Sequence, residues 1–498
     1  MLDGMSIHPH RLRSLSAPVG VGALALLLLF GATIAARSSP AAFIVCGLAL
    51  VALVGVAAIW WPRTAIVVVV LSPIMDRYIV ADMLPPDLES ASHYLSEGLL
   101  LTVALILAAR AWREGTLVAA FRHPVTAVFI AFAAIAVVSA AVNGVPPHIA
   151  LIGIVFTIDA AALFFLPRLV GFSQRQAIAA IGTLCSIVFV SAVLAVAQGL
   201  LSARILGLVP VRGRFGEEVR LASLFGDPNV FGAFLVTAVP FAILGAARLP
   251  SRRLRWLAAA VAFVLLLALW LSFSRGAWIA LILGVGTMLA IVDRRALLIG
   301  LVLSVASFAT AAEMPRNLLV PRAPRPNIVD STIDRVETVG IGGDLRTLFV
   351  INALPIVRDH PLLGVGPGRY GGAVAHTFGT PIYAEYDTDV LFWRPTQRTV
   401  DNFWLHLLVE TGFIGLAAFL TAAFIPGLRI LGAARRSIGT RRILLGGIAA
   451  ATTGMAVSSA TTMLLEANSI GFPFWFLLGI GLLAVGARSA RLEESPAT

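Results

Sequence analysis

"TVDNFWLHLLVETGFIGLAAFL", residues 399–420, lies where a polar segment gives way to a long apolar run. A helix needs about 20 mostly apolar residues to cross a bilayer, and this run is long enough. Asp401 stands at its start, where an aspartate is favoured as an N-cap. Glu410 follows about 13 Å further along the helix axis. We therefore predict a membrane span with one carboxylate at its mouth and a second inside it.

An acid inside a span is costly, and it marks either a functional group or a buried pair. Glu410 is therefore interpreted either as a salt bridge or hydrogen bond to a neighbouring span, or as a group with a direct catalytic role. Asp159 lies in the middle of the apolar run 149–167 and could equally be a protonated, packed acid. Glu466 lies near the outer end of the apolar run 443–464. The sequence leaves these alternatives open.

The composition of the whole chain predicts many such spans. Of 498 residues, 59% are hydrophobic and 13% are charged, whereas a soluble protein carries about 25% charged residues. We predict an all-α integral membrane protein with about 12–14 transmembrane helices and one large outer loop that carries interfacial helices. The candidate runs are residues 17–36, 41–61, 64–82, 94–112, 124–142, 149–167, 176–200, 228–248, 255–272, 275–292, 296–312, 402–428, 443–464 and 470–487.

Arginine in the short connections predicts the orientation of these spans. The net charge is +11, and the chain has no lysine. Arginines recur in alternate short connections, which the positive-inside rule assigns to the cytoplasm together with both termini. The predicted parts are a cytoplasmic N-terminus (1–16), an N-terminal transmembrane bundle (17–312), a large outer loop with an amphipathic helix (313–400), C-terminal transmembrane helices (401–487) and a cytoplasmic tail (488–498).

Other classes of partner and cofactor find little support. The positive charge is spread over short connections between spans, so nucleic acid is not predicted as a partner, whereas membrane lipids are. Cys46 and Cys185 both lie in apolar runs, so a structural disulfide is not expected. Cysteine and histidine form no metal-ligand cluster in the sequence, and no cofactor is predicted.

Two segments on the predicted outer side, 201–227 and 313–400, are rich in arginine. Long loops are exempt from the positive-inside rule, so the predicted orientation stands. This arginine predicts an anionic ligand at the outer face. A solvated loop that touches anionic lipid headgroups is the alternative.

The second of these segments contains a predicted helix and a glycine run. Residues 342–372 predict about four helical turns with Asp344 as N-cap, a kink at Pro355 and an end near Pro361. The glycine run 364–372 has no preceding strand and no following GK[ST], so it predicts a turn rather than a phosphate loop.

Three arginines are placed to act on one ligand. Asp227 and Pro228 predict the start of a span, with Arg220 just before it, and Arg275 lies in a tight turn between two spans at the same depth. Together with Arg346 from the loop helix, they would form a forked site for a pyrophosphate. Snorkelling to the interface explains each arginine separately.

Four segments together resemble a known family: "VRLASLFGDPN" (219–229), "SFSRGAW" (272–278), "DLRTLFVINALPIVRDHPLLGVGPGRY" (344–370) and "DNFWLHLLVETGFIGLAAFL" (401–420). They resemble, in order, the O-antigen ligase and O-antigen polymerase superfamily of bacterial membrane glycosyltransferases. The resemblance implies a metal-independent, inverting transfer of a glycan from undecaprenyl pyrophosphate to a hydroxyl of an acceptor glycan or lipid. The implied location is the outer face of the cytoplasmic (inner) membrane.

The resemblance also implies roles for single residues. Arg220 and Arg346 match the pyrophosphate arginines, and Arg275 matches a third position. Asn402, Gly412 and Gly415 match the ligase pattern, but Asp401 stands where ligases have histidine. This departure favours a polysaccharide or exopolysaccharide polymerase over a lipopolysaccharide ligase.

The sequence therefore leaves two candidates for the base that activates the acceptor. A free aspartate has a pKa near 4 and is a weaker base than histidine. Asp401 either accepts the proton of the acceptor hydroxyl or orients that hydroxyl, and His376 in the loop is the alternative base.

Two other classes of function remain as alternatives. A polysaccharide or lipid-linked glycan transporter, or flippase, predicts charges near the midplane and internal repeats. Asp159 and Glu410 fit the first feature, but no repeat is visible in the sequence. A structural or lipid-sensing scaffold is the third hypothesis.

Overall fold

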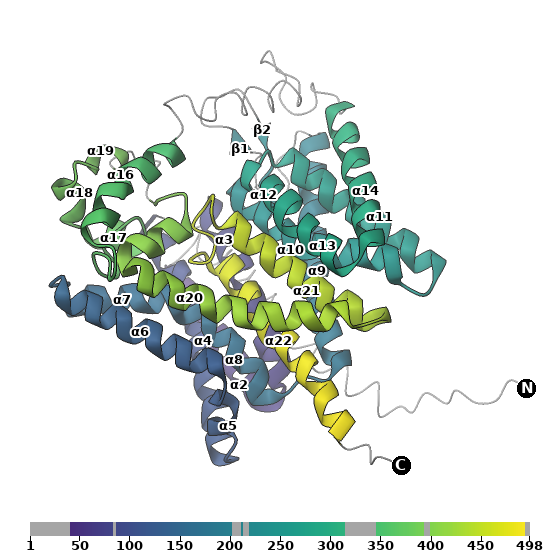
Figure 1. Ribbon diagram of the computed structural model, residues 1–498, viewed down its shortest axis with the longest axis horizontal. Coiled ribbons are helices and arrows are strands. Elements are labelled where there is room, and N and C mark those ends of the chain that lie inside the picture. The colour runs from purple at the N-terminus through teal and green to yellow at the C-terminus, as the bar shows by residue number, and fades with distance from the viewer. Residues whose placement is uncertain are drawn as a thin grey trace, which may run out of the picture. The chain divides into compact units, whose positions relative to one another are not determined.

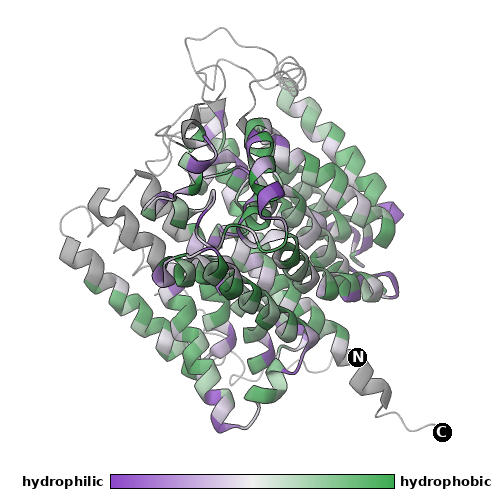
Figure 2. Ribbon diagram, turned by 60° about the vertical axis from the view of Figure 1, so that its left-hand side comes forward, coloured by the Kyte–Doolittle hydropathy of each residue, from purple (hydrophilic) through white to green (hydrophobic). Residues whose placement is uncertain are grey.

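The structure is a computed structural model that describes residues 40–82, 86–201, 211–212, 219–313, 345–392 and 399–493. The predicted span 17–36 and the predicted N-cap Asp344 lie outside these residues. Within them, ten helices are long and apolar enough to cross a membrane, and two shorter apolar helices precede these ten. Apolar residues cover the helices, and hydrophilic residues gather at the helix ends and in the connections (Figure 2). The prediction of an all-α integral membrane protein is confirmed.

The chain divides into two compact units. Unit 1 comprises Met1–Ala120 and Phe165–Gly171, and unit 2 comprises Phe121–Phe164 and Phe172–Thr498. The helices between residues 40 and 201 are α2 (Pro40–Trp60), α3 (Pro62–Asp82), α4 (Pro86–Arg113), α5 (Leu117–Phe121), α6 (Pro124–Val142), α7 (Pro147–Ile158), the 3-10 turn Asp159–Ala161, α8 (Ala162–Val170) and α9 (Gln174–Leu201). The later long helices are α10 (Pro228–Arg248), α11 (Arg252–Leu271), α12 (Arg275–Ile279), the π-helical turn Ala280–Val285, α13 (Gly286–Val292), α14 (Arg294–Glu313), α20 (Phe403–Arg435), α21 (Gly439–Ser458) and α22 (Asn468–Glu493).

Proline interrupts the sequence of α3 in unit 1 without ending the helix. Pro73 has no N–H for the carbonyl of Val69, which would normally be its partner in the helix. The hydroxyl of Ser72 lies 2.9 Å from that oxygen and takes the place of the missing donor. Because a carbonyl in the membrane has to be satisfied within the protein, Ser72 explains how this helix continues through its proline to Asp82.

Helix α10 forms the centre of unit 2. Its start confirms the predicted cap, because the Asp227 carboxylate accepts the N–H groups of Asn229 and Val230, and Pro228 is the first helical residue. The helix is apolar on all sides and almost entirely buried, as expected for a span enclosed by other helices. It packs between α11 and α21. Glycine permits the close approach of α21, since a Cβ at Gly447 would lie 2.2 Å from the ring of Phe241.

Several helix ends meet at one end of unit 2, which we call the site end. Helices α10, α12 and α20 begin there, and α11 and α21 end there. The N–H of Leu221 donates to the carbonyl of Leu271 at the end of α11. The N–H of Phe403 at the start of α20 donates to the carbonyl of Ser459, just after α21. The strand pair β1 (Val211–Arg212) and β2 (Val219–Arg220) leads into this end of the unit.

Four short helices lie beside the start of α20 (Figure 1). They are α16 (Leu345–Asp359), α17 (Ala373–Phe378), α18 (Ile382–Glu385) and α19 (Asp389–Phe392). Helix α16 confirms the predicted helix of about four turns, and it continues through Pro355. Buried aromatic rings hold this group together. Tyr383 stacks on Phe392 with centroids 4.1 Å apart, and Tyr370 and Phe349 contact Phe392 from other sides.

Helix α20 is broken at Gly412, inside the run 402–428 that the sequence predicted as one span. Gly412 has φ 65°, and a Cβ there would lie 2.2 Å from the carbonyl oxygen of Leu362. Segment 361–366 occupies the break. Its N–H groups at Val365 and Gly366 donate to Val409 and Glu410, and its carbonyls at Pro361 and Leu362 accept from Phe413 and Ile414. The loop thus satisfies the backbone groups that the broken helix exposes.

Gly412→Ala should therefore destabilise the protein strongly. A side chain at positive φ costs about 1–3 kcal/mol, and the added methyl group would also displace the backbone of Leu362. We expect a clearly lower unfolding temperature in detergent, with Gly427→Ala as the control. Gly427 belongs to the same helix and has open space around its Cβ position. Equal unfolding temperatures for the two variants would contradict this account of the break.

Candidate active site

Arg346 and Asp401, which are 55 positions apart in the sequence, meet at the site end. Arg346 lies in the first turn of α16, and Asp401 precedes α20 by two residues. The guanidinium Nε lies 3.6 Å from Oδ2 of Asp401, and the two side chains are 26% and 29% exposed. Arg346, predicted to bind the pyrophosphate, and Asp401, predicted to activate the acceptor, are thus direct neighbours, and both side chains are partly exposed.

The N-cap of α20 is Asn402, and the prediction that Asp401 caps this helix is wrong. Oδ1 of Asn402 accepts the N–H of Leu405 at 3.1 Å. Asn402 has the extended backbone typical of a cap, with φ −162° and ψ 105°. Sequence alone does not separate these two neighbours, since both are good capping residues. The consequence is that Asn402 has a structural task, whereas the carboxylate of Asp401 does not serve as the cap.

Arg220 binds the end of α11. Its Nε donates to the carbonyl of Ser272 at 3.1 Å, and its Nη2 lies 3.3 Å from the carbonyl of Phe273. Phe273 has a positive φ of 51°, which is unusual for a large side chain. Arg220 therefore stabilises a strained turn at the position where α11 ends and α12 begins.

The same turn places Arg275 beside Arg220. Nη2 of Arg220 donates to Oδ1 of Asn229 at 2.9 Å, and the hydroxyl of Ser274 donates to that same oxygen at 3.2 Å. Ser274 is the N-cap of α12, and Arg275 is the first residue of this helix. Asn229 thus joins Arg220 to the turn that carries Arg275.

The connection between α21 and α22, residues 459–467, contacts the start of α20 near Asp401 and the start of α12 at Arg275. Its first residue, Ser459, accepts the N–H of Phe403, which follows Asn402 directly. Thr461 lies against the start of α12, where a Cβ on Gly276 would come within 1.8 Å of the threonine hydroxyl. The predicted site residues Arg220, Arg275, Arg346 and Asp401 therefore all lie at the site end, in two groups that flank one connection.

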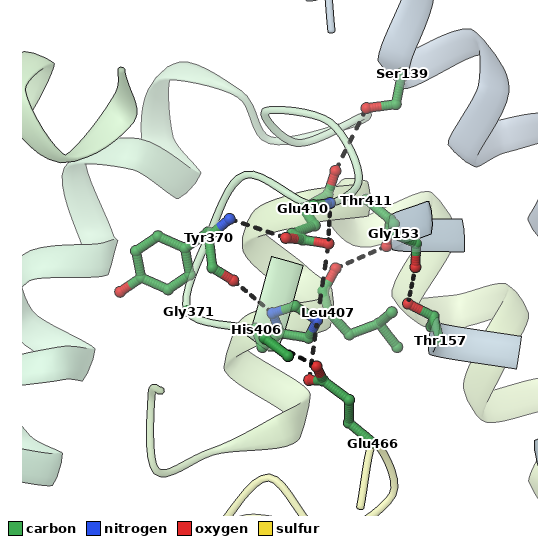
Figure 3. Close-up of polar contacts among 12 residues, drawn as sticks. Ser139, Gly153, Thr157, Tyr370, Gly371, His406, Leu407, Glu410, Thr411 and Glu466 are labelled. Atoms are coloured by element: carbon green, nitrogen blue, oxygen red, sulfur yellow. Dashed lines mark hydrogen bonds and ion pairs between the residues drawn. The ribbon is translucent and has the colours of Figure 1, made fainter. Parts of the chain in front are cut away.

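Glu410 anchors the glycine run to α20. Its carboxylate is buried, and one oxygen accepts the N–H of Gly368 at 2.9 Å. The other oxygen accepts the N–H of Tyr370 at 2.8 Å (Figure 3). The prediction of a hydrogen bond is confirmed, but the donors belong to the loop 364–372 and not to a neighbouring span. These bonds also explain the glycine run, because its backbone donors face a carboxylate of the protein itself rather than a phosphate.

His406 and Glu466 complete a buried cluster that the sequence did not predict. Nδ1 of His406 donates a hydrogen bond of 2.5 Å to the carbonyl of Tyr370 (Figure 3). Nε2 lies 3.7 Å from Oε2 of Glu410 and 3.9 Å from Oε2 of Glu466. Oε1 of Glu466 accepts the N–H of Ala373 at the start of α17. The spacing of His406 and Glu410, four residues apart on one helix face, was the available signal.

The structure corrects the place of Glu466. The sequence placed this residue near the outer end of the span 443–464, but α21 ends at Ser458 and Glu466 lies in the following connection. In that connection, Glu466 accepts a hydrogen bond from the N–H of Ala373, the first residue of α17. His376, the alternative base, lies exposed on the same short helix. Within the described ranges, no group of three or more histidine, cysteine or acidic residues is arranged to hold a metal ion.

Two tyrosines help to fix the loop in front of this cluster. The hydroxyl oxygen of Tyr383 accepts the N–H of Gly371 at 2.8 Å. Burial raises the pKa of Tyr383 above its ordinary value, and burial also raises that of Tyr370. Both side chains therefore stay neutral at physiological pH and act as structural rather than charged groups.

Comparison with known families gives one match. Residues 260–420 match the family model described as O-antigen ligase. The match covers about a third of the chain and includes Arg275, Arg346 and Asp401, while Arg220 precedes it. It supports the predicted O-antigen ligase and polymerase superfamily and a glycosyltransferase-like membrane enzyme. A search of curated proteins found no match.

Proposed function

We propose that this chain, a member of the O-antigen ligase and polymerase superfamily, transfers or polymerises a glycan from undecaprenyl pyrophosphate onto an acceptor hydroxyl at the outer face of the cytoplasmic membrane. The observation that carries the proposal is the contact of Arg346 with Asp401 at the site end of a membrane bundle. A cation for the leaving group and a carboxylate for the acceptor are the two groups that this transfer needs.

The proposed chemistry follows from these groups. The acceptor oxygen forms a bond to the anomeric carbon, and the bond from that carbon to the pyrophosphate oxygen breaks on the opposite side, with inversion. The electron pair leaves with the lipid pyrophosphate, and the acceptor proton passes to Asp401. Arg346, Arg275 and Arg220 would stabilise the charge that develops on the pyrophosphate without a metal.

Exposed apolar side chains support a lipid-linked donor. Helix α16 turns Val350, Ile351 and Leu354 outward, although it belongs to the group of short helices at the site end. Leu362, in the segment that fills the break in α20, and Phe413, next to Gly412, are also exposed. A helix with such a face lies at the membrane interface, and it would bring Arg346 to the level of lipid headgroups.

The opposite end of unit 2 supports the proposed orientation. Short connections there carry arginines in the segments 248–255, 294–295 and 435–442. The positive-inside rule assigns short arginine-rich connections to the cytoplasm. The site end would then face outward, where a lipid-linked glycan is transferred. The aspartate at position 401 supports a polymerase over a lipopolysaccharide ligase, since ligases have histidine there.

The break in α20 favours one other function, because transporters often use discontinuous helices at their substrate site. Here, however, segment 361–366 hydrogen-bonds to both sides of the break, and Glu410 is bound to the loop. The backbone groups that a transporter would offer to its substrate are thus already hydrogen-bonded within the protein. For this reason the flippase is the second candidate and not the first.

Incubation of the purified protein with an undecaprenyl-pyrophosphate-linked glycan and an acceptor glycan tests the proposal. We expect release of undecaprenyl pyrophosphate together with a longer or newly attached glycan, because transfer breaks the sugar–phosphate bond. The same protein in vesicles tests the alternative. Movement of the intact lipid-linked glycan across the bilayer, with no release of the pyrophosphate for any acceptor tried, would show that the protein is a flippase.

A further inference from the structure

We propose that the connection between α21 and α22, residues 459–467, is a positioning element that sets the spacing between Arg275 and Arg346. This inference rests on the proposed function and deepens it, because it assigns the two phosphates of the leaving group to two separate groups of arginines. One phosphate would lie at the start of α12, beside Arg275 and Arg220, and the other at the start of α16, beside Arg346. The connection would determine whether one pyrophosphate can reach both groups.

The start of α12 lies directly against Thr461. Gly276, the second residue of α12, is buried, and a Cβ at this position would overlap the hydroxyl oxygen of Thr461 and lie 2.8 Å from its Cβ. The threonine is itself fixed, since its hydroxyl and its N–H both donate to the carbonyl of Ser458 at 2.9 Å. Arg275 precedes this contact by one residue. The contact therefore fixes how closely Arg275 approaches the connection.

Helix α20 begins against the first residue of the same connection. The N–H of Phe403 donates to the carbonyl of Ser459 at 2.9 Å, and Ser459 is fully buried. Ser459 and Thr461 are two positions apart, so their Cα atoms lie within about 7 Å of each other. A stretch of three residues thus joins the helix that follows Asp401 to the helix that begins with Arg275.

The other end of the connection binds the loop that is paired with the segment before Asp401. Oε1 of Glu466 accepts the N–H of Ala373 at 3.0 Å. Two residues earlier in that loop, the carbonyl of Gly371 accepts the N–H of Val400 at 2.9 Å. Asp401 follows Val400 directly, so the connection holds the segment of Asp401 on both sides, once directly and once through the loop.

A site divided in this way distinguishes a pyrophosphate from a single phosphate. Arg346 lies beside Asp401 on one side of the connection, and Arg275 lies on the other side. A pyrophosphate offers oxygens on two phosphorus atoms, and the forked donors of an arginine can bind each phosphate. A change in spacing therefore weakens the binding of an anion that bridges both groups. An anion that needs only one group is not affected.

Substitution of Gly276 changes the spacing and leaves every arginine in place. Alanine is intrinsically favoured over glycine inside a helix, so Gly276→Ala acts through its contact with Thr461. We expect it to lower the affinity for inorganic pyrophosphate about ten-fold, the effect of losing one charge-assisted hydrogen bond. The affinity for orthophosphate should stay near that of wild type. Gly286→Ala, later in the same interrupted span, meets only an ordinary contact of 3.5 Å and should change neither affinity.

A double-mutant cycle shows whether this effect passes through the connection. Thr461→Gly removes the atoms that a Cβ at position 276 would meet, so in this background Gly276→Ala should no longer weaken pyrophosphate binding. Glu466 provides an independent pair of variants. Glu466→Ala should weaken pyrophosphate binding selectively. Glu466→Gln should recover most of it, because the amide oxygen can still accept the N–H of Ala373.

The ratio of the two affinities separates the possible results. A variant that is merely less stable has fewer binding sites for both anions, and its ratio of affinities is unchanged. If Gly276→Ala and Glu466→Ala weaken both anions equally, or weaken neither, the connection does not set the spacing, while the proposed function stands. If wild type binds neither pyrophosphate nor orthophosphate, the arginine site of the proposed function is wrong, and this inference fails with it.

Discussion

Arg346→Ala should lower the rate of glycan transfer by about 100- to 1,000-fold, the range observed when one group that stabilises a developing negative charge is removed. Arg346 lies at the start of α16 beside Asp401, with about a quarter of its side chain exposed. Its loss removes a charge that the leaving pyrophosphate needs. The measurement is the initial rate of undecaprenyl pyrophosphate release from a lipid-linked glycan.

Arg358→Ala is the matched control for this variant. Arg358 lies in the last turn of the same helix and is exposed, so its removal changes the charge of α16 equally. We expect near-normal transfer for Arg358→Ala and an unchanged unfolding temperature for both variants. Arg346→Lys should recover a small part of the activity, because lysine keeps the charge but lacks the forked donors. Normal transfer by Arg346→Ala would remove Arg346 from the site.

Arg220 does not permit an equally clean experiment. Removal of a residue that only bound the pyrophosphate would abolish transfer and leave the fold intact. In the structure, however, the guanidinium of Arg220 binds the carbonyls of Ser272 and Phe273 and the amide of Asn229. Loss of these bonds would disturb the turn that positions Arg275. A loss of activity in Arg220→Ala therefore does not by itself separate ligand binding from local structure.

Features that depend on neighbours in the sequence could be predicted. The lengths of the apolar runs gave the helices, because each span must satisfy its own backbone hydrogen bonds. The cap at Asp227, the turn before Arg275 and the helix that became α16 are also local, since a few adjacent residues determine each of them.

Contacts between distant residues could not be predicted. Nothing near Glu410 in the sequence indicates that its partners are the N–H groups of Gly368 and Tyr370, about 40 positions earlier. The break at Gly412 has the same origin, because the loop that fills it is a separate segment. Asp401 and Asn402 are adjacent and chemically similar, so only the backbone geometry shows that Asn402 caps α20.

Glu410→Ala should lower the free energy of unfolding by about 3–5 kcal/mol and abolish most transfer. The substitution leaves the N–H groups of Gly368 and Tyr370 buried without acceptors, and each such group costs about 1–3 kcal/mol. His406 also loses one of the two carboxylates beside it. The loop around Tyr370 would then be held less firmly against α20. Val400, which is hydrogen-bonded to Gly371, and its neighbour Asp401 would shift with it. Thermal unfolding in detergent and limited proteolysis of the loop measure the two effects.

Glu410→Gln separates this anchoring role from direct catalysis. The amide oxygen of glutamine can accept one of the two loop N–H groups, whereas its NH₂ group would face the other donor. We therefore expect stability and transfer between those of wild type and Glu410→Ala, with both properties falling together. Thr421→Ala, an exposed substitution in the same helix, should change neither. A Glu410→Gln protein that keeps full stability but loses all transfer would mean that the carboxylate takes part in the reaction itself. The structure argues against that outcome, because Glu410 is only 3% exposed and both of its oxygens are bound to the loop.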